Sequence, residues 1–135
     1  MIGIDAIYRI NGIELRGQFI YNNISNSAAY NAFGQTNMGS AMMGYYLEAG
    51  YNVFQHTKMK SQLIPFVRFE HYDTQYQMAN DLAKTDANSR TEITAGLGWK
   101  ITPGTVLKAD YQKVTSADKT AGPKYLLNMG VGVWF

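Results

Sequence analysis

Hydrophobic and polar residues alternate along most of this chain, and no helical period of about 3.6 residues persists anywhere in it. Because successive side chains of a strand point to opposite faces, this alternation predicts strands with one apolar and one polar face. The alternating segments are bounded by turn-forming residues, so we expect an all-β, antiparallel up-and-down meander of about seven strands. The expected strands are residues 2–10, 13–21, 41–54, 62–72, 90–101, 105–114 and 125–135.

The first hairpin specifies its own register. Asn11-Gly12 separates the first two segments, and a type I′ turn needs positive φ at both central positions, which Asn and Gly tolerate. A two-residue turn there pairs Ile10 with Ile13 on one face and Arg9 with Glu14, of opposite charge, on the other. A slip of one residue would break both pairings, so the register is strongly specified.

The connections between the expected strands differ in length. A second tight turn is expected at Thr102-Pro103-Gly104, with Gly104 suited to a left-handed conformation. An antiparallel meander places alternate connections at opposite ends, so one end should carry short turns and the other long loops. The polar composition of the first long loop disfavours a hidden strand within it. The long loops are residues 22–37, 73–88 and 115–124.

The composition narrows the class of protein. The 135 residues are treated as one region, 1–135, and charged residues make up 16%, below the roughly 25% typical of soluble domains. The absence of cysteine excludes a disulfide scaffold and a thiolate metal site, and a net charge of +2 indicates no nucleic-acid partner. No apolar run reaches the roughly 18 residues of a transmembrane helix. A membrane β-barrel would escape such a scan, because its alternation averages out.

Alternation alone does not decide which environment the apolar face meets. A soluble lipocalin-like barrel is apolar inside and polar outside, and a membrane barrel is the reverse. Glycine favours the membrane barrel, because it weakens a water-facing strand but leaves room inside a barrel for large side chains such as Arg16 and Arg68. The glycines on the polar faces are Gly44, Gly50, Gly96, Gly98, Gly130 and Gly132.

Aromatic residues on the apolar faces lie towards the ends of the expected strands, whereas the middles hold smaller residues such as Ala49, Val67 and Ala95. This distribution is typical of the two girdles of a membrane barrel, where amphipathic rings lie at headgroup level. The rings are Tyr8, Tyr21, Tyr45, Tyr51, Trp99, Tyr111, Tyr125 and Phe135.

The last segment carries the most specific pattern. One of its faces is apolar without interruption, at Tyr125, Leu127, Met129, Val131, Val133 and Phe135. A final phenylalanine on such a strand resembles the C-terminal signature of Gram-negative outer-membrane proteins. The resemblance implies localisation in the cell outer membrane, contact with its lipid, and insertion by the barrel-assembly machinery. The residues of this assembly signal are Met129, Val131, Val133 and Phe135.

Other segments resemble the C-terminal strands of general and phosphate-selective porins. Residues 45–51 read YYLEAGY, residues 64–74 read IPFVRFEHYDT, residues 95–100 read AGLGWK and residues 108–112 read KADYQ. The resemblance implies an outer-membrane porin, which forms a water-filled channel for passive diffusion of small hydrophilic solutes or ions. It also implies a larger barrel, of about 16 strands for example, and a homotrimer.

Counting strands back from Phe135 predicts an incomplete barrel. The last strand of a porin descends to the periplasm, so the first of seven also descends, and Met1 would lie at the extracellular end. Complete bacterial barrels have an even number of strands, and the first residues show no signal-peptide pattern. We therefore expect the chain to be the C-terminal part of a larger porin.

Charged residues on the polar faces are the candidates for a channel wall. Residues at i, i+2 spacing share one face about 7 Å apart. Arg68, in the middle of its strand, is the strongest candidate for contact with anionic groups of a solute. The alternative is that these charges only satisfy one another. The expected i, i+2 pairs are Glu14/Arg16, Arg68/Glu70 and Lys108/Asp110. The candidates for lining the pore are Arg16, Glu48, Arg68, Glu70, Glu92, Lys100, Lys108 and Asp110.

No catalytic residue, cofactor or metal site is expected, and the protein is not expected to be an enzyme. His71 directly follows Glu70, so alternation places the two side chains on opposite faces, which argues against an acid–histidine dyad. Three alternatives to the porin stay open. One is a soluble lipocalin-like β-barrel that binds an apolar ligand, and another is an outer-membrane barrel without a channel. The third is a barrel enzyme that uses loop residues, which loss of a hydrolytic activity on replacement of His71 would support.

Overall fold

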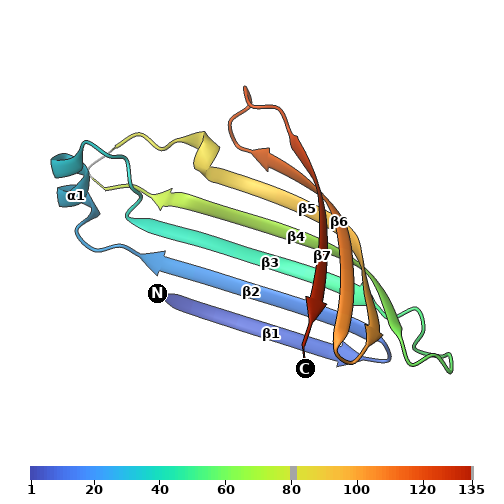
Figure 1. Cartoon of the computed structure of the whole chain (residues 1–135). Helices are drawn as coiled ribbons and strands as arrows, with labels where there is room; N and C mark the ends of the chain where they lie inside the picture. The colour runs from blue at the N-terminus through green and yellow to red at the C-terminus, as the bar shows by residue number, and fades with distance from the viewer. Residues whose placement is uncertain (80–81, 135) are drawn as a thin grey trace.

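A computed structural model describes residues 1–79 and 82–134 of the chain. Its seven strands form one sheet in which every neighbour is antiparallel and the order follows the sequence, as Figure 1 shows. This confirms the all-β up-and-down meander that the alternation predicted. The elements are β1 (Ile2–Ile10), β2 (Ile13–Asn23), α1 (Ser27–Gly34), β3 (Ala41–Tyr51), β4 (Gln62–Gln77), the 3₁₀ turn η1 (Asp86–Asn88), β5 (Ser89–Thr102), β6 (Thr105–Ser116) and β7 (Lys124–Val133).

The first hairpin adopts the predicted register. Asn11 and Gly12 have φ angles of 46° and 82°, so both central residues of the turn are left-handed. Ile10 pairs with Ile13, and Arg9 pairs with Glu14 on the other face.

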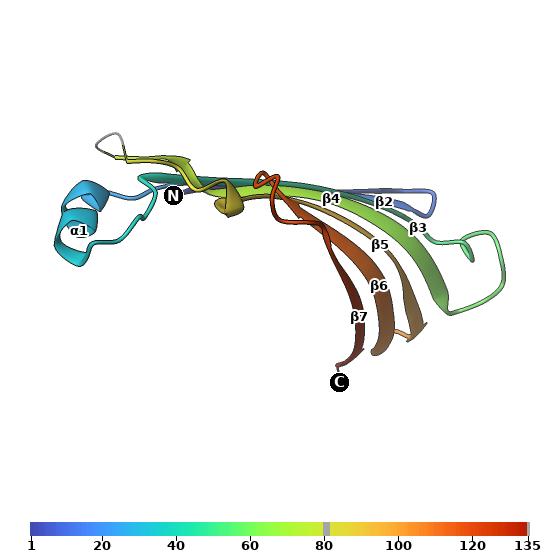
Figure 2. The same ribbon diagram turned by 90° about the horizontal axis from the view of Figure 1, so that it is seen from above.

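The sheet is curved and is not closed. The elements β4 to β7 curl away from the flatter part formed by β1 to β3, so that one side of the sheet is concave (Figure 2). The two edges are β1 and β7. Because all neighbours are antiparallel and the strands number seven, these two edge strands run in the same direction.

The sheet has almost no hydrophobic core. Among the described residues, the only buried hydrophobic side chains are those of Ala41 and Phe66. The apolar faces are instead exposed along the whole convex side; Leu47 is 64% exposed, Val67 56% and Met129 78%. Nothing in the described part of the chain packs over this side, because the sheet is a single layer (Figure 2).

The first long connection contains a helix that the sequence did not predict. The helix α1 lies beyond the strand ends, and Ser27 and Asn31 are its buried residues. The side chain of Asn31, rather than an apolar face, holds the helix against the following loop. Its Nδ2 donates to the carbonyl of Met38 and its Oδ1 accepts from the Met38 amide, both at 2.8 Å. Of the helices that the structure describes, none is long and apolar enough to cross a membrane.

The strand β4 continues five residues past its expected end at residue 72, so the loop predicted at 73–88 is wrong over 73–77. Gln75 stabilises this extension, although it is polar and only 3% exposed. Its side-chain Nε2 donates to the carbonyl of Asn37, and its Oε1 accepts from the Thr85 amide at 2.7 Å. Gln75 therefore links the two long connections at this end of the sheet.

Two smaller expectations are wrong. Gly104 is not left-handed, because Gly12 is the only glycine in the described residues with positive φ. A shift in pairing between Lys100 and Thr102 instead provides the irregularity that closes this turn. The aromatic residues are also not confined to strand ends: Tyr111 lies in the middle of β6, directly opposite Ala95.

The left-handed turn provides a first prediction. Gly12→Ala should lower the free energy of unfolding by about 1–2 kcal/mol, because an L-residue resists positive φ. An added Cβ would also lie 2.8 Å from Cβ of Gln55. Urea unfolding followed by circular dichroism measures the loss. Gly122→Ala is the matched control, since nothing lies within 4 Å of the added Cβ. Equal midpoints for the two variants would contradict the turn geometry.

Candidate functional site

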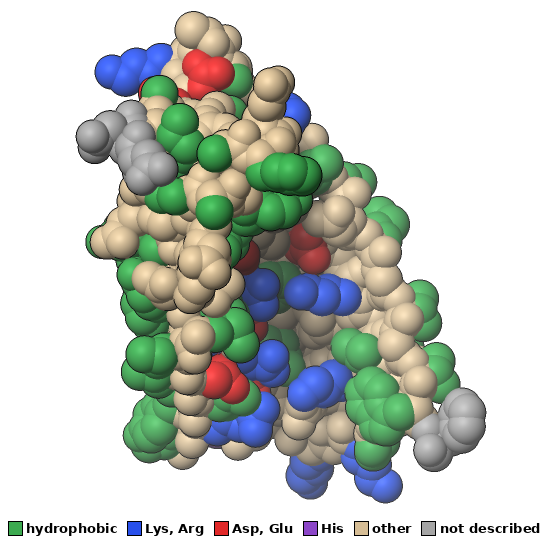
Figure 3. Space-filling view, turned by 90° about the vertical axis from the view of Figure 1, so that its left-hand side faces the viewer, with side chains coloured by type: hydrophobic (Ala, Val, Ile, Leu, Met, Phe, Trp, Pro, Cys, Tyr) green, Lys and Arg blue, Asp and Glu red, His purple; other side chains and the backbone are tan. Residues whose placement is uncertain are grey.

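The charged side chains gather on the concave side of the sheet. Figure 3 shows lysine, arginine and acidic side chains inside the hollow, while hydrophobic side chains lie on the outer walls. Strands four places apart in a flat sheet lie about 19 Å from one another. Arg9 of β1 and Lys100 of β5 nevertheless line the same hollow, which requires curvature towards this face. The strand register places all eight predicted wall residues on it: Arg16, Glu48, Arg68, Glu70, Glu92, Lys100, Lys108 and Asp110.

An alternating row of charges crosses the middle of this face. Arg16, Glu48 and Arg68 are direct cross-strand neighbours on β2, β3 and β4. Glu48 Oε2 accepts a hydrogen bond from Arg68 Nε at 3.0 Å, and its Oε1 lies 3.7 Å from Arg16 Nε. The Arg68 guanidinium also lies over the ring of Tyr46, 4.4 Å from its centroid. The residue that the sequence favoured for solute contact is thus engaged on two sides.

The three expected i, i+2 ion pairs are all present. Arg16 Nε donates to Glu14 Oε1 at 2.6 Å, and Glu14 also pairs with Arg9 across the hairpin. The other two pairs are longer: Arg68 Nη1 to Glu70 Oε2 is 3.7 Å and Lys108 Nζ to Asp110 Oδ2 is 3.9 Å. The spacing argument predicted these pairs because strand geometry alone brings such residues together.

Two like charges face each other nearer the long loops. Glu70 and Glu92 are direct cross-strand partners, an arrangement that is unfavourable without compensation. Glu92 receives that compensation from neutral donors, since Tyr72 Oη donates to its Oε1 at 2.9 Å and Gln112 Nε2 donates to its Oε2. Sequence reasoning did not select Tyr72 and Gln112, although both lie on the polar face by alternation.

Four of the six predicted glycines, Gly44, Gly50, Gly96 and Gly132, are closely approached by other residues, mainly by aromatic and aliphatic side chains, whereas Gly98 and Gly130 are not. A Cβ at Gly96 would lie 2.8 Å from Cε1 of Phe66, and one at Gly44 would lie 3.2 Å from Cβ of Tyr72. The expected beneficiaries, Arg16 and Arg68, are not among these close neighbours. Phe66 therefore packs into the glycine-lined wall and becomes buried.

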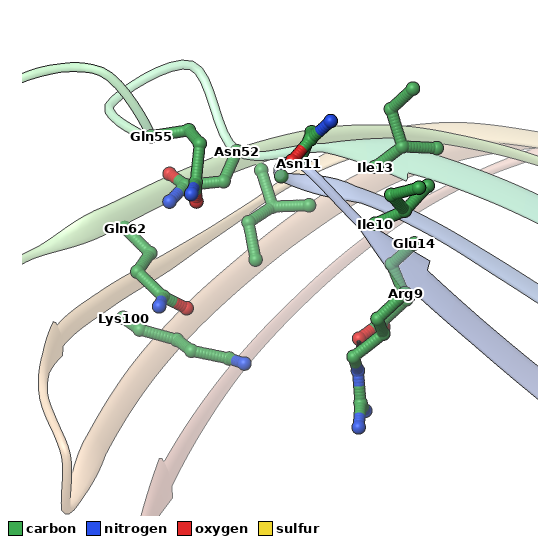
Figure 4. Close-up of a pocket in the computed structure, with 11 residues that line it drawn as sticks. Arg9, Ile10, Asn11, Ile13, Glu14, Asn52, Gln55, Gln62 and Lys100 are labelled. Carbon is green, nitrogen blue, oxygen red and sulfur yellow. Dashed lines mark hydrogen bonds and ion pairs between the residues drawn. The ribbon is translucent and has the colours of Figure 1, made fainter.

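The short-turn end of the concave face contains a cluster of cations. Lys100 and Lys108 line a hollow of about 150 Å³ together with Arg16, Glu14 and Glu48. The Lys108 ammonium lies 4.5 Å from the centroid of the Phe66 ring. A second hollow of about 320 Å³ adjoins it and is lined by Arg9, Lys100 and several amide side chains (Figure 4).

His71 lies on the convex face, on the side opposite Glu70, as alternation predicted. It pairs with Tyr45 in the register, its ring centroid lies 5.7 Å from that of Tyr45, and its Nδ1 lies 3.1 Å from the Thr91 hydroxyl. Within residues 1–79 and 82–134, no three His, Cys, Asp or Glu side chains are grouped as metal ligands.

Three residues of the expected assembly signal lie on the edge strand β7. Met129, Val131 and Val133 are on its convex face and are exposed. Phe135, the fourth residue of the signal, lies outside the described residues.

Comparison with known proteins leaves the family open. No family model matches the chain, and no solved structure matches it. An uncharacterised protein of Aquifex aeolicus is 31% identical over 78 residues, which is 58% of this chain and 18% of that protein. The chain thus covers less than a fifth of the length of this relative.

The charge row provides a second prediction. Glu48→Gln should lower the free energy of unfolding by about 1–2 kcal/mol, because it leaves Arg16 and Arg68 as neighbours without the shared carboxylate. Their partial exposure keeps the loss below that of a fully buried pair. Asp5→Asn is the control, since this exposed carboxylate has no ion pair among the described residues. Unfolding midpoints that agree for both variants would contradict the role of Glu48.

Proposed function

We propose that this sheet is part of the wall of an outer-membrane β-barrel, a porin that lets small hydrophilic solutes or ions diffuse through a water-filled lumen. The observation that carries the proposal is the assignment of the faces. The concave side holds most of the charged strand residues, and the exposed convex side holds most of the apolar ones. A soluble barrel needs its apolar side chains on the concave side, where they can pack together.

The edges of the sheet support a larger barrel. Each unpaired backbone group in hydrocarbon costs several kcal/mol, so β1 and β7 must both find partners in a bilayer. Since the two edges run in the same direction, they could join each other, or a copy rotated about the barrel axis, only as parallel neighbours. An antiparallel barrel therefore needs an odd number of further strands between them, which gives the even total of bacterial barrels.

The mechanism needs no chemical step. Solutes would cross the membrane down their concentration gradients, and the mixed charges of the concave face would set the preference among ions. Arg16 and Arg68 share Glu48, and each also contacts a second glutamate, so their main effect would be to brace the wall. The less fully paired lysines would leave a positive potential near the short turns. Contact with outer-membrane lipid, recognition of β7 by the barrel-assembly machinery, and a homotrimer belong to the same proposal.

A pair of adjacent substitutions tests the membrane exposure of the convex face. Met129→Arg should destabilise the protein in lipid bilayers by about 2–4 kcal/mol, because it places a cation among acyl chains. Asn128→Arg, one residue away on the other face, should cost little. Asn128 Nδ2 donates to Asp110 Oδ1 at 2.8 Å, so an arginine at this position would find the same carboxylate as its partner. Urea unfolding in vesicles measures both. Both positions are exposed in the isolated chain, so equal effects would favour a soluble protein.

The channel itself is tested by electrical recording. The protein purified from its native membrane should produce stepwise, ohmic conductance in a planar lipid bilayer. Each step would be the insertion of one channel, and the current would be ohmic because a water-filled lumen is permanently open to ions. Protein that inserts into the bilayer without any conductance would contradict the porin and favour a non-channel barrel. Protein that stays soluble and monomeric without detergent would favour the lipocalin-like alternative.

A further inference from the structure

The acidic residues near the short turns are already neutralised. Glu14 is bound by both Arg9 and Arg16. Glu48 is shared in the same way between Arg16 and Arg68. Each carboxylate therefore already has two arginine partners, and neither compensates the charge of the nearby lysines.

Two lysines of this region remain without close acidic partners. Lys100 forms no ion pair with any residue in the part of the chain that the structure describes, and Lys108 has only Asp110, at 3.9 Å. Both lysines line the smaller hollow, and Lys100 lines the larger one as well. The floor of the concave face thus carries excess positive charge at this end.

The larger hollow adds hydrogen-bonding groups of a second kind. Asn52, Gln55 and Gln62 line it from the connection between β3 and β4 and from the start of β4. Gln62 is the direct cross-strand partner of Lys100, and Figure 4 shows the two side chains extending side by side towards Arg9 and Glu14. Side-chain amides both donate and accept hydrogen bonds, which matches the needs of hydroxyl groups. The volume of about 320 Å³ falls in the range of small-molecule sites.

We propose that this hollow is a binding site for a small polyhydroxylated oxyanion, with Lys100 as its principal charge contact. The ammonium of Lys100 would bind the carboxylate or phosphate group, and the amides would bind the hydroxyl groups. The site extends the proposed channel function, because solute would reach it from the lumen. The site would make the channel selective, because it would bind an anionic solute more tightly than a neutral solute of the same size.

Gluconate and sorbitol are the probes, because they share a six-carbon polyol skeleton and differ in the carboxylate. Ligand-observed NMR with the detergent-solubilised protein should detect binding of gluconate at low ionic strength, where charge is least screened. Sorbitol should bind at least about tenfold more weakly, since it lacks the charge-assisted contact. Inorganic phosphate as a third probe shows how much of the affinity needs the hydroxyl groups.

Substitution of the lysine then locates the site. Lys100→Gln should weaken gluconate binding about tenfold and leave sorbitol unchanged, and Lys100→Arg should restore most of the gluconate affinity. Lys119→Gln is the matched control, because it removes the same charge from the exposed loop between β6 and β7 at the opposite end. Circular dichroism and heat-dependent gel migration verify that each variant is folded.

The outcomes separate this inference from the proposed function. Equal binding of gluconate and sorbitol, or a Lys100→Gln variant that binds gluconate like the unaltered protein, would overturn the oxyanion site even if the protein conducts. Gluconate binding that depends on Lys100 in a protein without conductance would sustain the site and overturn the channel.

Discussion

The apolar convex face is the constraint on which the rest of this structure depends. A single-layer sheet packs nothing over either side, so burial of side chains inside the described chain contributes little to its stability. The strands are held by their backbone ladders and by cross-strand side-chain contacts. In hydrocarbon no water would compete for the backbone groups of these ladders. The proposed bilayer would therefore cover the apolar face, which is unfavourable in water.

The concave face follows from the same constraint. Once the apolar side chains point outwards, alternation places most charged strand residues on the concave face, and the curvature of the sheet brings them closer together. Asp73 and Lys113 are exceptions, since they pair with Met43 and Ile93 on the convex face. Arginines and glutamates of neighbouring strands then neutralise one another across the middle, and glycines let Phe66 pack into the wall. What remains is a small surplus of positive charge near the short turns, carried by Lys100 and Lys108.

The sequence specifies the strands and their local pairs because both depend on regular backbone geometry. The Asn11-Gly12 turn fixed the first register, and i, i+2 spacing predicted the contact of Arg68 with Glu70. Features that depend on partners distant in the sequence could not be predicted. The extension of β4 rests on hydrogen bonds from Gln75 to residues in two different loops, and α1 is too short to show a helical period.

The candidate site shows the same division. Alternation alone was enough to predict that its eight charged residues share one face of the sheet. The opposition of Glu70 and Glu92 depends on the register across a long loop. That Lys100 and Arg9 line one hollow depends on the curvature of five strands. Neither the register across a long loop nor the curvature of the sheet can be predicted from a local sequence pattern. The glycines signalled a crowded concave face, but the identity of the crowding residues, Phe66 and Tyr72, emerged only from the three-dimensional arrangement.

The most direct test of the account is the environment of each face along one strand. The chain contains no cysteine, so single cysteines at residues 126–131 can carry spin labels without background. In vesicles, collisions with oxygen, which concentrates in lipid, should be frequent at 127, 129 and 131. Collisions with a water-soluble nickel complex should be frequent at 126, 128 and 130. Loss of this alternation, or a reversed one with the odd positions exposed to water, would contradict the assignment of the faces.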